Sequence, residues 1–190
     1  VGKTARGVDV RAHGSGSMGA TNVLRTVGLK ASLLVFLLDL SKGALPVLIA
    51  GWLTHSLEAQ IAGALAALVG HNWPLFASFR GGRGVTTSLG SLFVMAHWAG
   101  VAALTVGLLV ILTFRYGSAG SIAGTLVGAA ATLFLVAVIG YPMEFLIYAL
   151  AAAALIVFQH RHNISRLIRG TELKLELKLS RHNSKETLKG

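Results

Sequence analysis

Two long segments without a formal charge limit what this chain can fold into. Neither the stretch from Val85 to Phe114 nor the stretch from Tyr116 to Met143 contains an Asp, Glu, Lys or Arg. A helix that crosses a bilayer needs about 20 mostly apolar residues. Only 13% of the 190 residues are charged and the mean hydropathy is +0.69, whereas about a quarter of the residues of a soluble domain are charged. We therefore predict an all-α, polytopic integral membrane protein with one domain over residues 1–190.

The apolar stretches predict six transmembrane or half-spanning helices. They cover approximately residues 31–52, 57–69, 85–96, 101–114, 121–139 and 144–158. Several of them are short, because twelve to fifteen helical residues extend only about 18–22 Å and the hydrocarbon core is ~30 Å thick. Short helices leave room for polar loops that re-enter the membrane edge under cover of protein.

Alternation of the six helices places four polar segments on one side of the membrane. These are residues 1–30, 70–84, 115–120 and 160–190, which together carry every Arg and Lys except Lys42. The positive-inside rule then puts this side in the cytoplasm. Because the chain starts with Val1 rather than Met, we expect a missing first helix, which would make seven helices in the intact protein. Residues 171–190 are expected to be a basic cytoplasmic tail, with a short strand or surface segment of little chemical content from Leu173 to Leu179.

The composition excludes several kinds of function. The chain has no cysteine, so it has neither a disulfide framework nor a thiolate nucleophile. Its formal net charge is +10, but no nucleic-acid-binding module is recognisable. The basic residues flank apolar spans, which favours membrane lipids and phosphorylated substrates as partners. We expect no nucleic-acid partner.

The first polar segment contains a glycine-rich loop. Gly14, Gly16 and Gly19 fit the dinucleotide-binding spacing and Asp39 follows 20 residues later, but no βαβ unit surrounds them. A flexible connector is one alternative, and a phosphate cradle formed by successive backbone N–H groups is the favoured one. Donors around the glycines are Ser15, Ser17, Thr21, Asn22 and Arg25.

The next span contains the pair Asp39 and Lys42, which are three residues apart and so share a helix face. A charge within the membrane usually finds a partner and faces the protein interior. We interpret the two residues as a neutralised structural pair.

A second loop runs from Gly70 to Ser88 and includes His71, which we interpret as a supporting residue. Trp73, Phe76 and Phe79 are suited to anchor it at the membrane interface. The loop then opens a helix, so its N–H groups and the positive helix end could meet an anion; a plain basic turn is the alternative. The residues at this opening are Gly81, Gly82, Arg83 and Gly84.

The third segment follows the last span. His160 and Asn163 are three residues apart and share a face if the helix continues beyond the membrane. His160 is a candidate general base or phosphate donor. The neighbouring basic residues are most simply contacts of lipid headgroups: Arg161, Arg166 and Arg169.

Four motifs in one order resemble the bacterial acyl-phosphate:glycerol-3-phosphate acyltransferases, the PlsY family. They are GSG-x-x-GATNVLR, D-x-x-KG-x-x-PV, GH-x-x-P-x-F-x-x-F-x-GG-[KR]-G and H-x-x-N-I-x-R-L-x-x-G-x-E, from Gly7 to about Lys174. The resemblance implies an enzyme of the bacterial inner membrane with a site that faces the cytoplasm. It implies transfer of a fatty acyl group from acyl phosphate to the 1-hydroxyl of glycerol 3-phosphate, without metal or cofactor, giving lysophosphatidic acid and phosphate.

By position, the resemblance also implies site residues. Ser15 and the backbone from Gly14 to Asn22 would hold a substrate phosphate, and Arg25, Arg83, His160 and Asn163 would complete the polar site. Three residues depart from the usual pattern, in which Asn stands at position 17, Lys at 83 and Arg at 159; they are Ser17, Arg83 and Gln159.

Direct attack by the 1-hydroxyl fits these residues, because an acyl phosphate already carries a good leaving group. The base is either His160 or a phosphate oxygen of a substrate. A transporter for a phosphorylated solute is the alternative function, although it should expose polar groups towards both faces. A CDP-alcohol phosphotransferase would need clustered acidic metal ligands, and the seven Asp and Glu residues are scattered.

Overall fold

The computed structural model describes residues 9–79 and 81–175, and within these ranges it is helical without a strand. All six predicted helices are present and the all-α prediction is confirmed. The elements in chain order are the 3-10 turn η1 (Val10–Ala12), α2 (Ala20–Thr26), α3 (Leu29–Thr54), α4 (Leu57–Asn72), the 3-10 turn η2 (Leu75–Ala77), α5 (Val85–Met95), α6 (His97–Phe114), α7 (Gly117–Phe134), the π-helical turn η3 (Leu135–Ile139), α8 (Met143–Gln159) and α9 (Arg161–Ile168).

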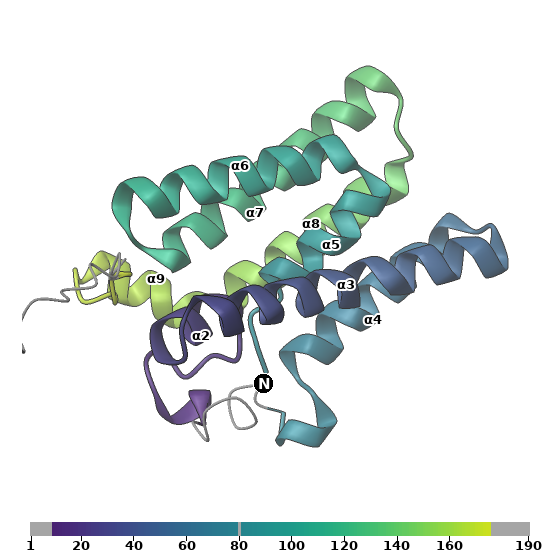
Figure 1. Ribbon diagram of the computed structural model, residues 1–190. Coiled ribbons are helices and arrows are strands. Elements are labelled where there is room, and N and C mark those ends of the chain that lie inside the picture. The colour runs from purple at the N-terminus through teal and green to yellow at the C-terminus, as the bar shows by residue number, and fades with distance from the viewer. Residues whose placement is uncertain (1–8, 80, 176–190) are drawn as a thin grey trace, which may run out of the picture.

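Two helix pairs, α3 with α4 and α6 with α7, lie on either side of α5 and α8 (Figure 1). Close approach between neighbours depends on glycine. A Cβ on Gly43 of α3 would lie 1.8 Å from the carbonyl oxygen of Thr87 on α5, and one on Gly90 would lie 2.0 Å from that of Leu40. Small residues let membrane helices pack at this distance, where van der Waals contact replaces the hydrophobic effect.

The boundaries of α6 and α7 differ from the prediction, and the cause is again glycine. The turn expected at 115–120 ends earlier, because α7 already begins at Gly117. A Cβ on Gly120 would lie 2.5 Å from the carbonyl oxygen of Gly107, and one on Gly124 would lie 2.6 Å from that of Ala103. These glycines therefore serve helix packing, whereas in a sequence they suggest a turn. The break between α5 and α6 lies at Ala96, so that α6 also begins earlier than expected.

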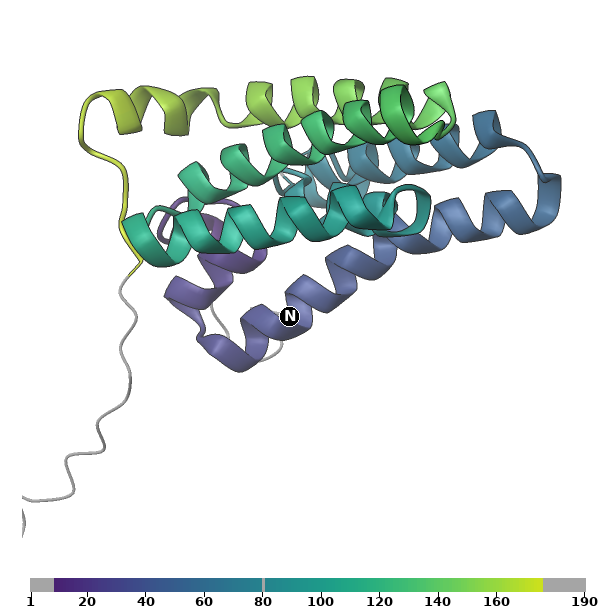
Figure 2. The ribbon, with the colours of Figure 1, turned by 90° about the horizontal axis from the view of Figure 1, so that it is seen from above.

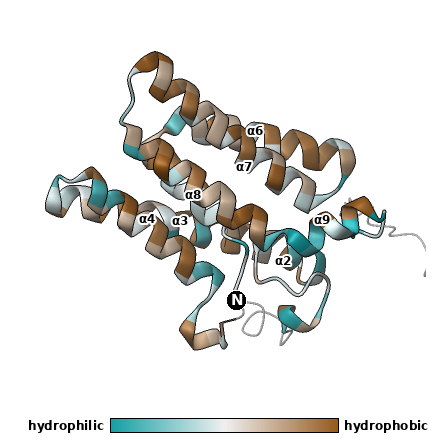
Figure 3. Cartoon of the chain, turned by 180° about the vertical axis from the view of Figure 1, so that it is seen from behind, coloured by the Kyte–Doolittle hydropathy of each residue, from teal (hydrophilic) through white to brown (hydrophobic). Residues whose placement is uncertain are grey.

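Among the described residues, three elements are long and apolar enough to cross a membrane: α3 with 26 residues, α6 with 18, and α7 continued by η3 with 23. The last predicted helix does not run straight past the membrane edge, since α8 and α9 meet at His160 with a bend of 58°. At 16 and 11 residues, α4 and α5 fit the expected half-spanning helices. In Figure 3 the apolar colour runs along the long helices, while hydrophilic residues gather around α2 and α9.

The polar segments meet at one end of the bundle, as predicted from the alternation of helices. In Figure 2, α9 and the segment after it extend beyond this end of the roughly parallel helices. That segment, Thr171–Leu175, is a strap that turns back over the bundle. The Leu175 N–H donates to the Arg115 carbonyl at 2.7 Å, and Arg25 Nη2 donates to the Leu173 carbonyl at 2.7 Å. The rest of the predicted tail, 176–190, lies outside the described residues.

Candidate active site

Asn22 on α2 holds the glycine-rich loop in shape. Its Oδ1 accepts the Ser15 N–H at 2.8 Å, and its Nδ2 donates to the carbonyls of Val10 at 2.9 Å, His13 at 3.1 Å and Ser17 at 2.9 Å. Its side chain is 2% exposed, so the amide is already used by the protein. Asn22 was expected to bind phosphate, but the structure uses its amide to fold the cradle. Gly14 has a φ of 60°, and a Cβ there would lie 2.3 Å from Asn22 Oδ1.

The second loop rests on the last turn of α4. Gly81 N–H donates to the Asn72 carbonyl at 3.2 Å, and Gly82 N–H donates to the His71 carbonyl at 3.1 Å. The His71 ring lies directly against the loop, because a Cβ on Gly82 would be only 1.9 Å from its Nε2. Gly84 then adopts a left-handed φ of 80° before the first residue of α5. The loop glycines are thus required for close contact with α4 and for the turn into α5.

Asp39 connects this support to α3. Its Oδ1 lies 2.8 Å from Lys42 Nζ, as the predicted pair requires, and 3.5 Å from His71 Nδ1. The Asp39 side chain is buried, whereas Lys42 is 58% exposed. The contact with His71 was not predicted, since no spacing rule connects residues 32 positions apart on different helices. Asp39 therefore links Lys42 and the ring that supports the Gly81–Gly84 loop.

His160 is buried at the bend between α8 and α9, with 1% of its surface exposed. Its Nδ1 lies 2.8 Å from the carbonyl oxygen of Ile156. A carbonyl only accepts, so the proton sits on Nδ1 and the lone pair of the neutral ring is on Nε2. Burial, with a smaller contribution from the nearby Arg83, lowers the pKa of His160 to about 4, although the Ile156 carbonyl and Glu172 oppose the shift. The ring is therefore neutral at pH 7 and can accept a proton or a hydrogen bond.

Glu172, on the strap, is the functional residue that the sequence reasoning missed. Its Oε1 accepts from Asn163 Nδ2 at 2.6 Å and from Ser118 Oγ at 2.8 Å, and its Oε2 accepts from Arg166 Nε at 2.7 Å. Burial opposes ionisation, but these donors outweigh it and keep the pKa of Glu172 below its usual value. Glu172 lies just before the segment that was predicted to have little chemical content; residues 173–175 of that segment make backbone hydrogen bonds with Arg25 and Arg115. The one available signal was the Glu that ends the fourth motif.

Three arginines surround this single carboxylate: Arg25, Arg83 and Arg166. Burial lowers the pKa of Arg83 to about 10, with Glu172 raising it and the other two arginines lowering it. The Arg83 guanidinium donates no hydrogen bond to any residue that the structure describes. Arg25 Nε is buried and has no hydrogen-bond partner in the part of the chain that the structure describes. The site therefore holds more positive charge than its own carboxylate neutralises, and it has free donors for an anion.

Two cavities meet at this cluster. The polar basin, of about 290 Å³, is lined by glycines and polar side chains of the two loops and α9. The apolar cavity, of about 300 Å³, extends from the cluster between α3, α5, α6, α7 and α8. Both are lined by three residues, which we call the neck: Ser15, Ser17 and Arg83.

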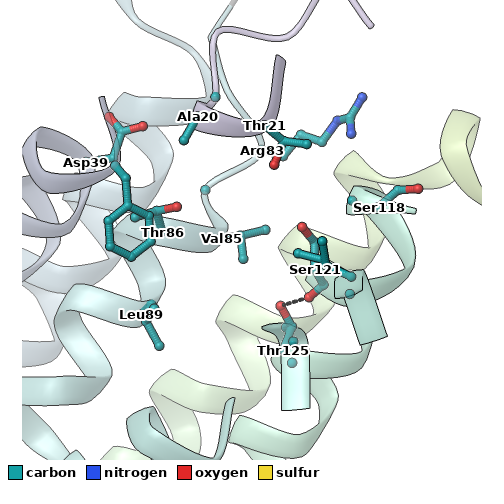
Figure 4. Close-up of a pocket in the computed structure, with 18 of the residues that line it drawn as sticks. Ala20, Thr21, Asp39, Arg83, Val85, Thr86, Leu89, Ser118, Ser121 and Thr125 are labelled. Atoms are coloured by element: carbon teal, nitrogen blue, oxygen red, sulfur yellow. Dashed lines mark hydrogen bonds between the residues drawn. The ribbon is translucent and has the colours of Figure 1, made fainter. Parts of the chain in front are cut away.

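Figure 4 shows the apolar cavity with Thr21 and Arg83 at its polar end. Asp39 and Leu89 lie on one wall, and Ser121 and Thr125 lie on the opposite wall. The Thr125 hydroxyl donates to the Ser121 carbonyl at 2.8 Å, which satisfies a polar group that would otherwise face an apolar space.

The structure brings nearly all predicted site residues to these cavities. Ser15, Gly16, Ser17, Gly81, Gly82, Arg83 and Asn163 line the basin. Gly19, Thr21, Asn22, Arg25, Asp39, His71, Gly84 and His160 line the apolar cavity, as does the unpredicted Glu172. Gly14 and Lys42 line neither cavity. They contact lining residues instead, Gly14 lying against Asn22 and Lys42 pairing with Asp39.

The sequence matches a family model described as glycerol-3-phosphate acyltransferase over residues 1–170. A glycerol-3-phosphate acyltransferase of Thermoanaerobacter sp. (strain X514) is 44% identical over 173 residues, which are 91% of this chain and 85% of the relative. One from Alkaliphilus metalliredigens is 37% identical over 95% of this chain and 89% of its own length. The crystal structure of PlsY, an integral membrane glycerol 3-phosphate acyltransferase, in its glycerol 3-phosphate form is similar with a TM-score of 0.83 and 40% identity, covering 92% of this chain and 88% of that one. The lysophosphatidic acid form gives a TM-score of 0.77.

Proposed function

Because the chain belongs to the glycerol-3-phosphate acyltransferase family, we propose that it transfers a fatty acyl group from an acyl phosphate to the 1-hydroxyl of glycerol 3-phosphate. The products are lysophosphatidic acid and inorganic phosphate, and this acylation begins phospholipid synthesis. The reaction uses no metal and no cofactor. Family membership favours this enzyme over the transporter for a phosphorylated solute.

The observation that carries the proposal is the neck. Ser15, Ser17 and Arg83 line the basin and the apolar cavity at once. An acyl phosphate has one apolar chain and one phosphate, so a molecule with its chain in the cavity and its phosphate in the basin places its carbonyl group at the neck. A thioester donor such as acyl-CoA would instead bring a nucleotide, and not a phosphate alone, to the basin.

The arginines overcome the repulsion between the two substrates. Each phosphate carries a charge of about −1.5 to −2 at pH 7. Two unit charges 4 Å apart repel each other by about 4 kcal/mol near a protein surface. Arg25, Arg83 and Arg166 supply three positive charges against Glu172. Neutralising both phosphates and fixing their relative position lowers the barrier by electrostatics and orientation.

The acyl group then moves in one displacement. The 1-hydroxyl oxygen forms a bond with the carbonyl carbon, the bond from that carbon to the phosphate oxygen breaks, and the bonding electrons leave with the phosphate. His160 Nε2 accepts the hydrogen bond of the hydroxyl and orients it, since its Nδ1 is committed to Ile156. With a pKa of about 4, His160 is a weaker base than a phosphate dianion, whose pKa is about 6. The proton therefore ends on a phosphate oxygen.

Ser15 and Asn163 bind phosphate from two sides of the basin. The Ser15 hydroxyl donates to no residue that the structure describes, so it is free for a ligand. Asn163 gives one N–H to Glu172 at 2.6 Å, and its second N–H remains for substrate. The glycine backbones of both loops complete the cradle.

The polar end faces the cytoplasm of the bacterial inner membrane in this proposal, because the basic residues gather there. The chain has no cysteine, so single cysteines can report the orientation. In spheroplasts, a membrane-impermeant maleimide should label His55→Cys and should label Thr171→Cys only after the membrane is opened. The reverse pattern would invert the topology.

The donor is tested with full-length protein purified in detergent. Glycerol 3-phosphate is incubated with palmitoyl phosphate or with palmitoyl-CoA, and lysophosphatidic acid is measured. Product from palmitoyl phosphate alone, lost in Arg83→Ala, supports the proposal. Product from palmitoyl-CoA alone would assign the protein to the acyltransferases that use thioesters.

A further inference from the structure

The lining of the apolar cavity ends at one level along the helices around it. On each of the four helices around its deep part, the lining residues stop at a definite position: Leu92 on α5, Ala103 on α6, Ala129 on α7 and Ala149 on α8. All four side chains are buried. No described residue of these helices farther from the polar end lines the cavity.

The helices touch one another at this level. A Cβ on Gly128 would lie 3.1 Å from Ala103 Cβ and 3.3 Å from Leu92 Cδ1. There is thus almost no room for another methyl group between α5, α6 and α7. On the other side, Ala129 packs in one cluster with Ala149 and Ala153 of α8. We call Leu92, Ala129 and Ala149 the floor.

The depth of the cavity matches an acyl chain. Its lining residues on α7 run from Gly117 at the polar end to Ala129 at the floor. At 1.5 Å per helical residue this is about 18 Å. The acyl chains of one leaflet occupy half of the ~30 Å hydrocarbon core, or about 15 Å. A chain of membrane length therefore reaches the floor when its phosphate lies in the basin.

We propose that the floor determines the length of acyl chain that this protein accepts. This inference rests on the proposed function, because it takes the occupant of the cavity to be the chain of the acyl donor. A chain that is too long meets Leu92 and the two alanines, which close-packed helices prevent from moving apart. A chain that is too short leaves the inner cavity without contacts.

The test compares kcat/KM for palmitoyl phosphate and lauroyl phosphate. Ala129→Leu and Ala149→Leu raise the floor, and the ratio of the two values should fall by about tenfold or more in each. Leu92→Ala lowers the floor and should raise the corresponding ratio of stearoyl to palmitoyl phosphate. The matched controls are Ala130→Leu and Ala151→Leu on the exposed faces of the same helices, and their ratios should equal that of the wild type.

Binding gives a second readout that does not need turnover. The thermal unfolding midpoint in detergent is measured with dodecyl phosphate and hexadecyl phosphate. The stabilisation by the longer compound should be lost in Ala129→Leu and retained in Ala130→Leu. Equal ratios and equal stabilisation in floor and control variants would overturn the inference. Absence of acyl transfer by the wild type, with the chain-length dependence of binding intact, would overturn the proposed function and leave the floor in place.

Discussion

Asn163 Nδ2 donates to Glu172 Oε1 at 2.6 Å, and this bond attaches the strap to α9 beside the polar basin. The same carboxylate accepts from Ser118 of α7 and from Arg166. One buried side chain thus fixes α7, α9 and the strap relative to one another. Asn163, which is proposed to bind substrate phosphate, is therefore oriented by Glu172, which lines the apolar cavity.

Removal of the Glu172 carboxylate should therefore damage both stability and activity. Glu172→Ala leaves three donors without their acceptor. We expect the free energy of unfolding to fall by about 2 kcal/mol, a value kept small because solvent screens the partly exposed Arg166. Glu172→Gln should lose less, since its amide oxygen can still accept. The thermal unfolding midpoint and kcat/KM are measured together. Wild-type values of both in Glu172→Ala would contradict this role.

The pH dependence of stability follows from the same residue. The pKa of folded Glu172 lies below its usual value, so its contribution is present above the pKa of the unfolded state, about 4.3. It is lost as the pH falls through the folded pKa. The difference in unfolding midpoint between the wild type and Glu172→Gln should be constant near pH 7 and should shrink below about pH 4.3. A difference in unfolding midpoint that grows on acidification would contradict a lowered pKa of Glu172 in the folded protein.

At position 83, activity should depend more on the positive charge of the arginine than on the planar shape of its guanidinium group. Arg83→Lys keeps a cation at the neck and should lower kcat/KM by about tenfold or less, because the planar fork is lost. Arg83→Ala should lower it by about 100-fold or more. Inhibition by inorganic phosphate should weaken in the alanine variant alone. Equal damage in both variants would show that the fork geometry, and not the charge, is what the site requires.

His160 should affect kcat more than KM. His160→Ala removes the acceptor at Nε2, and we expect kcat to fall by about 100-fold. Because the pKa of His160 is about 4, the ring stays neutral from pH 5 to pH 8 and should add no acidic limb to the profile of kcat/KM there. Substrate phosphates still titrate in this range, so the profile is compared with that of His160→Gln. Full activity in His160→Ala would remove the histidine from the mechanism.

The contact between His71 and Gly82 can be tested by a double-mutant cycle. Gly82→Ala places a methyl group where the His71 ring lies and should lower kcat/KM by about tenfold or more. His71→Ala vacates that space, so the double variant should be more active than Gly82→Ala alone. Additive losses would mean that the ring and the loop act independently.

The sequence predicted the helices and the residues of the site, but not every role. Apolar segments located all six helices, because a bilayer tolerates few other structures. Gly117 and Gly120 looked like a turn, since only the folded chain reveals that Gly117 packs against Thr21 of α2 and Gly120 against Gly107 of α6. Asn22 looked like a phosphate ligand, since its contacts with Val10 and His13 depend on how the loop folds back.

Polar contacts between distant parts of the sequence could not be predicted either, because they depend on how the separate elements pack. Asp39 with His71 and Glu172 with Ser118 connect residues on separate elements. Local spacing reaches only the next turn of the same helix, as it did for Asp39 and Lys42. The neck, likewise, exists only when the two loops meet.

An isotope label shows whether the 1-hydroxyl of glycerol 3-phosphate attacks the carbonyl carbon of the acyl phosphate. Glycerol 3-phosphate with a heavy oxygen isotope in its 1-hydroxyl is converted with palmitoyl phosphate, and both products are analysed by mass spectrometry. Attack on the carbonyl carbon should leave all the label in the ester of lysophosphatidic acid and none in inorganic phosphate. Label in a new phosphate ester, with free palmitate released, would show attack on phosphorus and would contradict it.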